Sequence, residues 1–202
     1  MNNPSNSSYT FFFAPMVKIW KREKSRLLAD CKVFKVREDS VRSDGKEIKV
    51  YVIENPDWVN IIALTDKQEV VLIEQFRYGT EEVILEIPGG MIDEGETAED
   101  AARRELSEET GFSAEKWILL GESNPNPAIQ NNKLYHFLAL NASKTGNVNF
   151  DENESVTTTL VKLEEISELI QSGRIKHSLV VAAFHYFSLW QSRNLQTEIP
   201  DL

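Results

Sequence analysis

The chain has 202 residues, a formal net charge of -10 and a sequence pI of about 4.9. This length accommodates one domain with a real core, or a domain with a small extension. The acidic balance argues against non-specific binding to nucleic acid or to anionic membranes, both of which require a basic surface. Cys31 is the only cysteine, which excludes an intrachain disulfide and a multi-cysteine metal site. We therefore expect a cytoplasmic location.

The N-terminal part of the sequence divides into a tail and a β-rich extension. Residues 1–15 are mostly polar, and their apolar patch at 11–14 is too short for a signal core or a membrane span, so we expect a disordered tail. Side chains alternate between polar and apolar at 32–36 and 47–52, with a turn signal at 43–46 between them. Residues 16–57 are therefore predicted to form a small antiparallel β extension.

The rest of the chain, residues 58–202, is predicted to be one mixed α/β domain. Apolar runs predict strands at 59–64, 70–76, 84–87, 117–120, 133–140 and 156–163. Helices are predicted at about 99–110, 164–171 and 178–193. The last helix carries apolar residues at helical spacing, which we interpret as its core face: Leu179, Ala182, Ala183, Tyr186 and Trp190.

The helix at 99–110 is unusually acidic on one side. Thr97 followed by Asp100 is a helix-start signal, and Gly111 is a typical helix end. Glutamates at 105, 108 and 109 then share one side of the helix, where like charges repel by a few tenths of a kcal/mol per pair. Arg104 offsets only part of this repulsion.

The surplus negative charge favours a hard divalent cation with oxygen ligands, such as Mg²⁺. The pair Gly89-Gly90 precedes the helix, and glycines there let the backbone approach closely and offer a carbonyl as a further ligand. The alternative is a surface helix with ordinary charge pairs. That alternative explains neither the glycine pair nor the excess of glutamate.

Residues 90–112 match without a gap the Nudix box, G-x5-E-x7-R-E-U-x-E-E-x-G-U, where U is aliphatic or aromatic. The chain thus resembles the Nudix hydrolases, which implies an α/β/α sandwich and hydrolysis of a nucleoside diphosphate linked to another group, with Mg²⁺ or Mn²⁺. By this resemblance, Glu105, Glu108, Glu109 and the Gly89 carbonyl are metal ligands, and Arg104 orients the glutamates.

Two residues outside the box are candidates for substrate binding. Arg77 ends a buried strand near the glycine loop, where a guanidinium can contact phosphate. A salt bridge to Glu81 or Glu82 is the alternative. Trp58 could stack on a nucleobase, and a core or interface aromatic is about as good an interpretation.

The acidic loop at 151–154 contains Glu152 and Glu154. An acidic loop is usually solvated surface, but here it is also a candidate source of the general base that deprotonates a metal-bound water. Glu108 of the box is a competing candidate for this base.

The runs at 74–77, 85–90 and 151–154, together with Pro127, resemble the ADP-ribose pyrophosphatase and nucleoside diphosphate sugar branch of the family. This resemblance implies that Arg77 contacts the diphosphate, that Glu86 and Pro127 help to bind the substrate, and that Glu152 with Glu154 supplies the loop carboxylate. It also implies a homodimer in which the N-terminal sheet reaches its partner; the alternative is a sheet that covers its own domain. Two other functions remain open: a house-cleaning pyrophosphatase for nucleoside triphosphates, and a non-catalytic sensor of sugar nucleotides.

Overall fold

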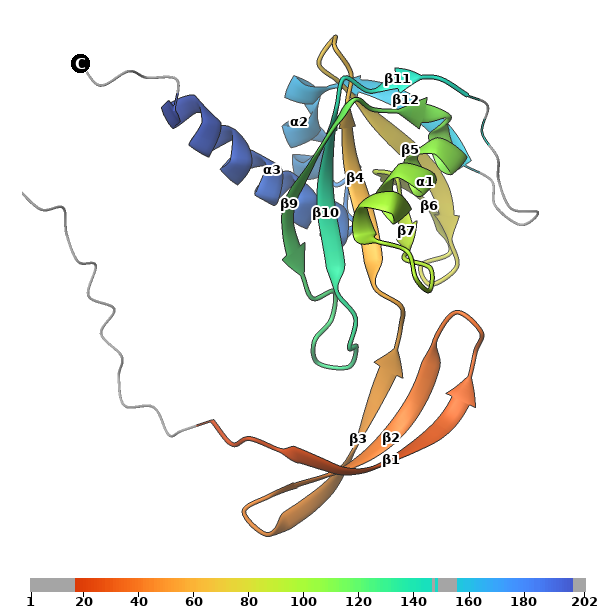
Figure 1. The fold of residues 1–202 in the computed structure, drawn as a ribbon, viewed down its shortest axis with the longest axis vertical. Helices are drawn as coiled ribbons and strands as arrows, with labels where there is room; N and C mark the ends of the chain where they lie inside the picture. Colours follow the sequence, from red (N-terminus) through yellow and green to blue (C-terminus); the bar gives the residue numbers. More distant parts are fainter. Residues whose placement is uncertain (1–16, 147, 149–155, 198–202) are drawn as a thin grey trace, which may run out of the picture.

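The computed structural model describes residues 17–146, 148 and 156–197, and only the backbone of 195–197. Within these residues the chain forms a three-stranded sheet, a seven-stranded sheet, a two-stranded ladder and three α-helices (Figure 1). The expected tail at 1–15 lies outside the described residues. So does the loop that carries Glu152 and Glu154.

The N-terminal sheet has the order β1-β2-β3 and is antiparallel. Its strands are β1 (Lys21–Asp30), β2 (Lys35–Ser43) and β3 (Lys46–Glu54). The β2–β3 hairpin confirms the sequence prediction, and its turn residues Asp44 and Gly45 both have positive φ, as two-residue hairpin turns require. Strand β1 was not predicted. All ten of its residues are exposed, so its side chains carry no alternation, and pairing with β2 holds the strand.

The main sheet has the order β12-β5-β4-β10-β9, while β6 pairs with β5 and β7 with β4. Its strands are β4 (Trp58–Leu64), β5 (Glu69–Arg77), β6 (Glu82–Glu86), β7 (Gly89–Met91), β9 (Lys116–Ser123), β10 (Leu134–Leu140) and β12 (Val156–Lys162). Strands β8 (Phe112–Ser113) and β11 (Ser143–Lys144) form the separate ladder. Every strand predicted in this part of the sequence overlaps an observed strand. Because β4 and β10 run parallel and the other pairs antiparallel, the sheet is mixed.

Helices cover both faces of the main sheet, which confirms the predicted α/β/α sandwich (Figure 1). Helix α1 (Ala98–Thr110) covers one face, and α3 (Ser178–Thr197) covers the other together with α2 (Ile166–Gln171), which follows a 3₁₀ turn at Leu163–Glu165. Successive side chains of a strand point to opposite faces, so Ile61 packs in the cluster of α1 and Ile62 in that of α3.

The predicted core face of α3 is wrong, because the buried face is rotated about the helix axis relative to it. Of its five residues only Ala183 is buried, and the buried side chains of this helix are Val180, Ala183, Phe184 and Phe187. Apolar residues are nearly continuous in this segment, so spacing alone could not fix which side faces the sheet. Tyr186 lies half-buried at the side of the contact, where its hydroxyl donates to the Glu122 carbonyl at 2.7 Å.

A buried polar network fixes α3 against the sheet. The Asn60 amide nitrogen donates to the Leu179 carbonyl at 3.0 Å, so its oxygen must accept from His136 Nδ1 at 2.8 Å. Nε2 of His136 is then the acceptor for the Ser123 hydroxyl, also at 2.8 Å. Burial lowers the pKa of His136 to about 4, which agrees with this neutral tautomer. His136 is therefore a satisfied structural histidine.

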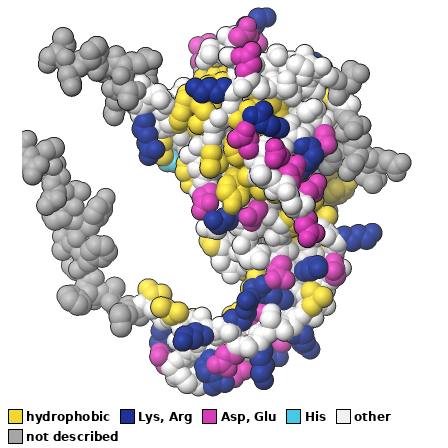
Figure 2. Space-filling model, in the orientation of Figure 1, with side chains coloured by type: hydrophobic (Ala, Val, Ile, Leu, Met, Phe, Trp, Pro, Cys, Tyr) yellow, Lys and Arg dark blue, Asp and Glu magenta, His cyan; other side chains and the backbone are white. Residues whose placement is uncertain are grey.

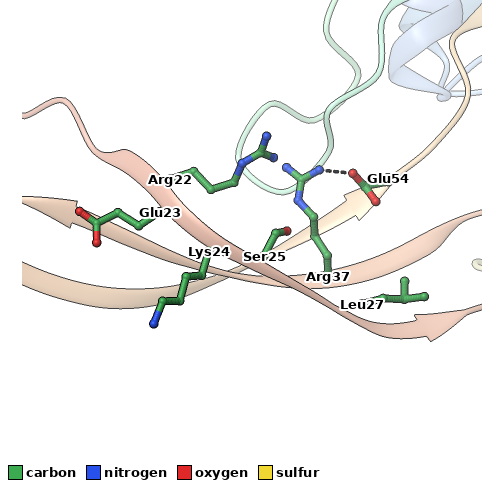
Figure 3. A pocket seen from close by; sticks show the side chains of 7 residues that line it. All are labelled: Arg22, Glu23, Lys24, Ser25, Leu27, Arg37 and Glu54. Atoms are coloured by element: carbon green, nitrogen blue, oxygen red, sulfur yellow. Dashed lines mark hydrogen bonds and ion pairs between the residues drawn. The ribbon is translucent and has the colours of Figure 1, made fainter.

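The N-terminal sheet carries a cavity of about 390 Å³ that is separate from α1 (Figure 3). It is lined by Arg22, Glu23, Lys24, Ser25, Leu27, Arg37 and Glu54. Arg37 pairs there with Asp39 and with Glu54, and Lys and Arg side chains crowd the same sheet in Figure 2. These basic residues form a largely paired, solvated surface.

No helix among the residues described here is long and apolar enough to cross a membrane.

Candidate active site

Helix α1 begins and ends close to where the sequence predicted. The Thr97 hydroxyl accepts from the Asp100 backbone nitrogen at 3.1 Å, and Gly111 closes the helix in the left-handed conformation at φ 71°. These two local signals set the rotation of the helix and therefore the direction of its glutamates. Figure 2 shows acidic side chains gathered over this part of the molecule.

Arg104 binds three carboxylates of the box at once. Its Nε and Nη2 donate to the two oxygens of Glu96 at 3.0 and 2.9 Å. Its Nη1 donates to Glu105 at 2.8 Å and to Glu108 at 3.2 Å, and Nη2 also reaches the Met91 carbonyl at 2.9 Å. The hydrogen bonds that Arg104 donates, above all those to Glu96, raise the pKa of Arg104, so the guanidinium stays charged. One positive charge against three carboxylates leaves a negative surplus.

The glycine loop is a short strand whose register directs its polar groups. Gly89 lies opposite Asn60, next to the position where the Ile61 nitrogen donates to the Pro88 carbonyl at 2.9 Å. Hydrogen-bonded and non-hydrogen-bonded pairs alternate, so Gly89 occupies a non-hydrogen-bonded position. Its carbonyl therefore points away from β4, and its N–H donates to Glu109 Oε2 at 3.0 Å.

Glycine is sterically required at position 89, where a Cβ would meet backbone, whereas at position 90 it leaves space for a movable carboxylate. A Cβ on Gly89 would lie 2.4 Å from the Val59 carbonyl oxygen, and one on Gly90 would lie 2.3 Å from Glu105 Oε1. Glycine thus lets the loop approach β4 and leaves room for the Glu105 carboxylate beside it.

The donor set of this region suits a hard divalent cation, because it consists of carboxylate and carbonyl oxygens. Among the described residues, no three or more His, Cys, Asp or Glu side chains converge as a metal cluster. The reason is visible in the contacts of Arg104, whose Nη1 lies within hydrogen-bond distance of both Glu105 and Glu108. The three box carboxylates, of Glu96, Glu105 and Glu108, therefore surround the Arg104 guanidinium.

A second charged group lies at the other end of the segment that carries the glycines. Glu86 ends β6 with a side chain only 3% exposed, and Arg77 donates to its two oxygens at 3.0 and 2.6 Å. His177 Nδ1 lies 3.2 Å from Glu86 Oε1, at ion-pair distance but without hydrogen-bond alignment. Burial alone would raise the pKa of Glu86, yet His177 and Arg77 outweigh it and lower this pKa to about 2. Glu82, one alternative partner of Arg77, pairs with Lys176.

The structure places Trp58 and Pro127 away from the box carboxylates. Trp58 lies two positions from Asn60 on β4, on the face that α3 covers, and is half-buried. Pro127 is exposed in the turn at 126–130, which bonds to β3 through the Ile53 nitrogen and the Ile129 carbonyl. Both residues therefore lie toward the junction with the N-terminal sheet.

The contact between His177 and Glu86 had no signal in the sequence. These residues come from the α2–α3 loop and from β6, and neither spacing nor a motif connects them.

Comparison with known proteins adds independent findings. The family model described as NUDIX domain matches residues 55–184. An ADP-ribose pyrophosphatase of Bacillus subtilis (strain 168) is 31% identical over 160 residues, which are 79% of this chain and 86% of that protein. A methanol dehydrogenase activator of Bacillus methanolicus is 31% identical over 174 residues, 85% of this chain and 94% of that protein.

A solved structure described as an ADP compounds hydrolase superimposes with a TM-score of 0.77. It covers 87% of this chain and 95% of its own, at 23% identity, and so speaks for the fold alone.

Proposed function

The chain belongs to the NUDIX family and is a Nudix pyrophosphohydrolase, and from that premise we propose that it hydrolyses the diphosphate bond of ADP-ribose or a related nucleoside diphosphate sugar. The products are a nucleoside monophosphate and a sugar phosphate. One observation carries the proposal: the segment from Glu86 to Gly90 joins a negatively charged group around Arg104 to the Arg77–Glu86 pair. A divalent cation needs the negatively charged group, and a diphosphate needs the guanidinium of Arg77 close to that cation.

The chain depends on a divalent metal, as its family does, and we assign Mg²⁺ or Mn²⁺ to Glu105, Glu108, Glu109 and the Gly89 carbonyl. When bound, such a cation polarises phosphoryl oxygens and lowers the pKa of the attacking water. Arg104 is anchored on Glu96 and orients Glu105 and Glu108 through its hydrogen bonds. The Gly89 N–H holds Glu109 in the same way.

Arg77 and Glu86 act on the substrate. The Arg77 side chain is 41% exposed, so its guanidinium can contact the diphosphate while the buried Glu86 anchors it. Trp58 and Pro127 would contact the nucleoside from the side of the N-terminal sheet. Glu152, with Glu154, would take the proton from the attacking water, and Glu108 is the alternative base.

Two alternatives have weaker support. The Bacillus methanolicus relative is named for the activation of a dehydrogenase, so identity near 31% does not fix the substrate. Hydrolysis of nucleoside triphosphates would use the same box. A non-catalytic sensor would be expected to have lost box glutamates, and this chain retains all of them.

The test is phosphate release in a phosphatase-coupled assay with Mg²⁺, run on ADP-ribose, several nucleotide sugars and nucleoside triphosphates. We expect turnover of ADP-ribose or one nucleotide sugar, and a loss of about 100-fold or more in Glu109→Gln. The control is Glu115→Gln, an exposed glutamate that accepts from Asn141 and should leave the rate unchanged. Turnover of triphosphates alone, or no turnover, would refute the proposal.

We further propose a cytoplasmic homodimer with the small-molecule nucleotide as its ligand. All of β1 is exposed, and apolar side chains such as Leu27 and Leu28 are 55% and 45% exposed. A small sheet with such side chains gains stability when a second subunit covers it. Sedimentation equilibrium decides this point, and a monomer at micromolar concentration would contradict it.

A further inference from the structure

Resting on the proposed function, we propose that His177 is a positioning residue. It holds Glu86, and through Glu86 the guanidinium of Arg77, in the orientation that receives the substrate diphosphate. Its Nδ1 is fixed 3.2 Å from Oε1 of that buried carboxylate.

The loop that carries His177 is fastened to β5 and β6. Arg174 lies 3.5 Å from Glu74, and Lys176 forms an ion pair with Glu82. Between them Ile175 is 1% exposed in the core, and its backbone nitrogen donates to the Leu169 carbonyl at 2.9 Å. These contacts therefore hold the loop against β5 and β6 and place His177 beside Glu86.

The backbone of His177 is also fixed to the frame of the glycine loop. Its carbonyl accepts from the Val180 and Val181 nitrogens at 3.0 and 3.1 Å, which makes it part of the first turn of α3. That turn is bonded to β4 through the Leu179 carbonyl and the Asn60 amide. Because β7 pairs with β4 at Asn60, the imidazole and the glycine loop share one rigid support.

Substrate binding would change the partners of the buried Glu86 carboxylate. A carboxylate with a 3% exposed side chain is costly to bury without partners. A diphosphate competes with Glu86 for Arg77, which is 41% exposed, whereas the 34% exposed His177 remains on Glu86 Oε1. His177 thus keeps the buried carboxylate compensated while the guanidinium engages phosphate. Without His177, Arg77 could bind phosphate only by leaving a buried charge poorly paired.

Two substitutions at His177 separate this role from a general structural one. In His177→Asn the amide nitrogen takes the place of Nδ1, whereas the amide of His177→Gln takes the place of Nε2. We expect His177→Gln to raise KM for ADP-ribose roughly tenfold with kcat changed less than about twofold. His177→Asn should restore KM to near the wild-type value. His185→Gln, on the exposed side of α3, is the matched control and should match wild type in both constants.

A second measurement does not need substrate. Unfolding midpoints of His177→Gln, Glu86→Gln and the double variant form a double-mutant cycle, and the proposal expects non-additive shifts. Additive shifts would overturn the inference, as would an unchanged KM in an active His177→Gln, or equal losses in the Asn and Gln variants. A wild type that is inert on ADP-ribose and on every nucleotide sugar would instead refute the proposed function, and the cycle alone would then decide whether His177 holds Glu86.

Discussion

The two charged groups of the candidate site are built in opposite ways. Around Arg104, one guanidinium serves three carboxylates, and around Glu86, one carboxylate has two nitrogen partners, Arg77 and His177. The first arrangement leaves a negative surplus suited to a cation. The second leaves a cationic arm suited to phosphate, within a chain whose net charge is -10. The local count of carboxylates, and not the overall composition, makes the first subsite negative; in the second, Arg77 and Glu86 balance in charge, and the exposed guanidinium is the part that phosphate can reach.

The two groups also differ in which of their members is buried. In the Glu86 group the carboxylate is the buried anchor at 3% exposure, and Arg77 reaches out at 41%. In the Arg104 group the guanidinium is 27% exposed, and Glu108 reaches out at 42%. In the Glu86 group the more buried member fixes the exposed one, whereas Arg104 is more buried than Glu108 but less buried than Glu96 and Glu105, at 17% and 14%. Changes at the anchors should therefore cost more than changes at their exposed neighbours.

The largest effect is expected from the buried anchor of the second group. The pKa of Glu86 falls from 4.5 to about 2 on folding, so its ionised form stabilises the fold above pH 5 and this contribution is lost as the pH falls toward 2. At about 1.4 kcal/mol per pKa unit, the contribution is about 3 kcal/mol. Urea unfolding of wild type and Glu86→Gln should therefore show a stability gap that narrows from pH 7 to pH 3.

The matched control for this titration is Glu115→Gln, whose exposed carboxylate contributes little to stability, so its curve should run parallel to that of wild type. A stability difference between wild type and Glu86→Gln that stays constant with pH would mean that Arg77 and His177 do not stabilise the ionised Glu86 carboxylate.

A smaller effect is expected at the anchor of the first group. Lysine cannot bind Glu96 through two nitrogens while also reaching Glu105, so Arg104→Lys should lower kcat/KM by about 10- to 100-fold. Arg103→Lys is its neighbour and control, because Arg103 pairs only with the exposed Glu99 and stacks over Trp117 among the contacts described. Equal losses in the two variants would show that the fork geometry of Arg104 is irrelevant.

The smallest effect tests the space beside Glu105, a carboxylate of the first group whose side chain is 14% exposed. In Gly90→Ala the new Cβ would meet Glu105 Oε1 at 2.3 Å and displace that carboxylate. We expect about a tenfold loss in kcat/KM and a higher Mg²⁺ concentration at half-maximal rate. Gly79→Ala, which has open space around its Cβ, should behave as wild type. An unchanged metal dependence in Gly90→Ala would argue against Glu105 as a ligand.

Much of the first group could be predicted from sequence, because it is built from local signals. The cap at Thr97, the end at Gly111 and the i, i+3 and i, i+4 spacing of the glutamates all act within one helix. The loop glycines precede this helix directly. The metal ligands and Arg104 could therefore be named without coordinates, although their roles still rest on the family resemblance and stand as proposals.

The second group could be predicted only in part. Arg77 and Glu86 were identified as substrate residues, but their mutual ion pair was not, and Glu81 and Glu82 were considered in its place. The pairing of β5 with β6 brings them together, and sequence neighbours compete on equal terms until that register is known.

What the sequence alone determined is the helix, the glycine loop, the positions of most strands along the chain and the oxygen-rich chemistry of the box, since each depends on residues a few positions apart. Only the tertiary structure decided the edge strand β1, the rotation of α3 and the meeting of His177 with Glu86. An exposed strand has no side-chain period to read, a helix that is apolar on most sides has no preferred phase, and a contact between distant segments depends on how the whole chain packs.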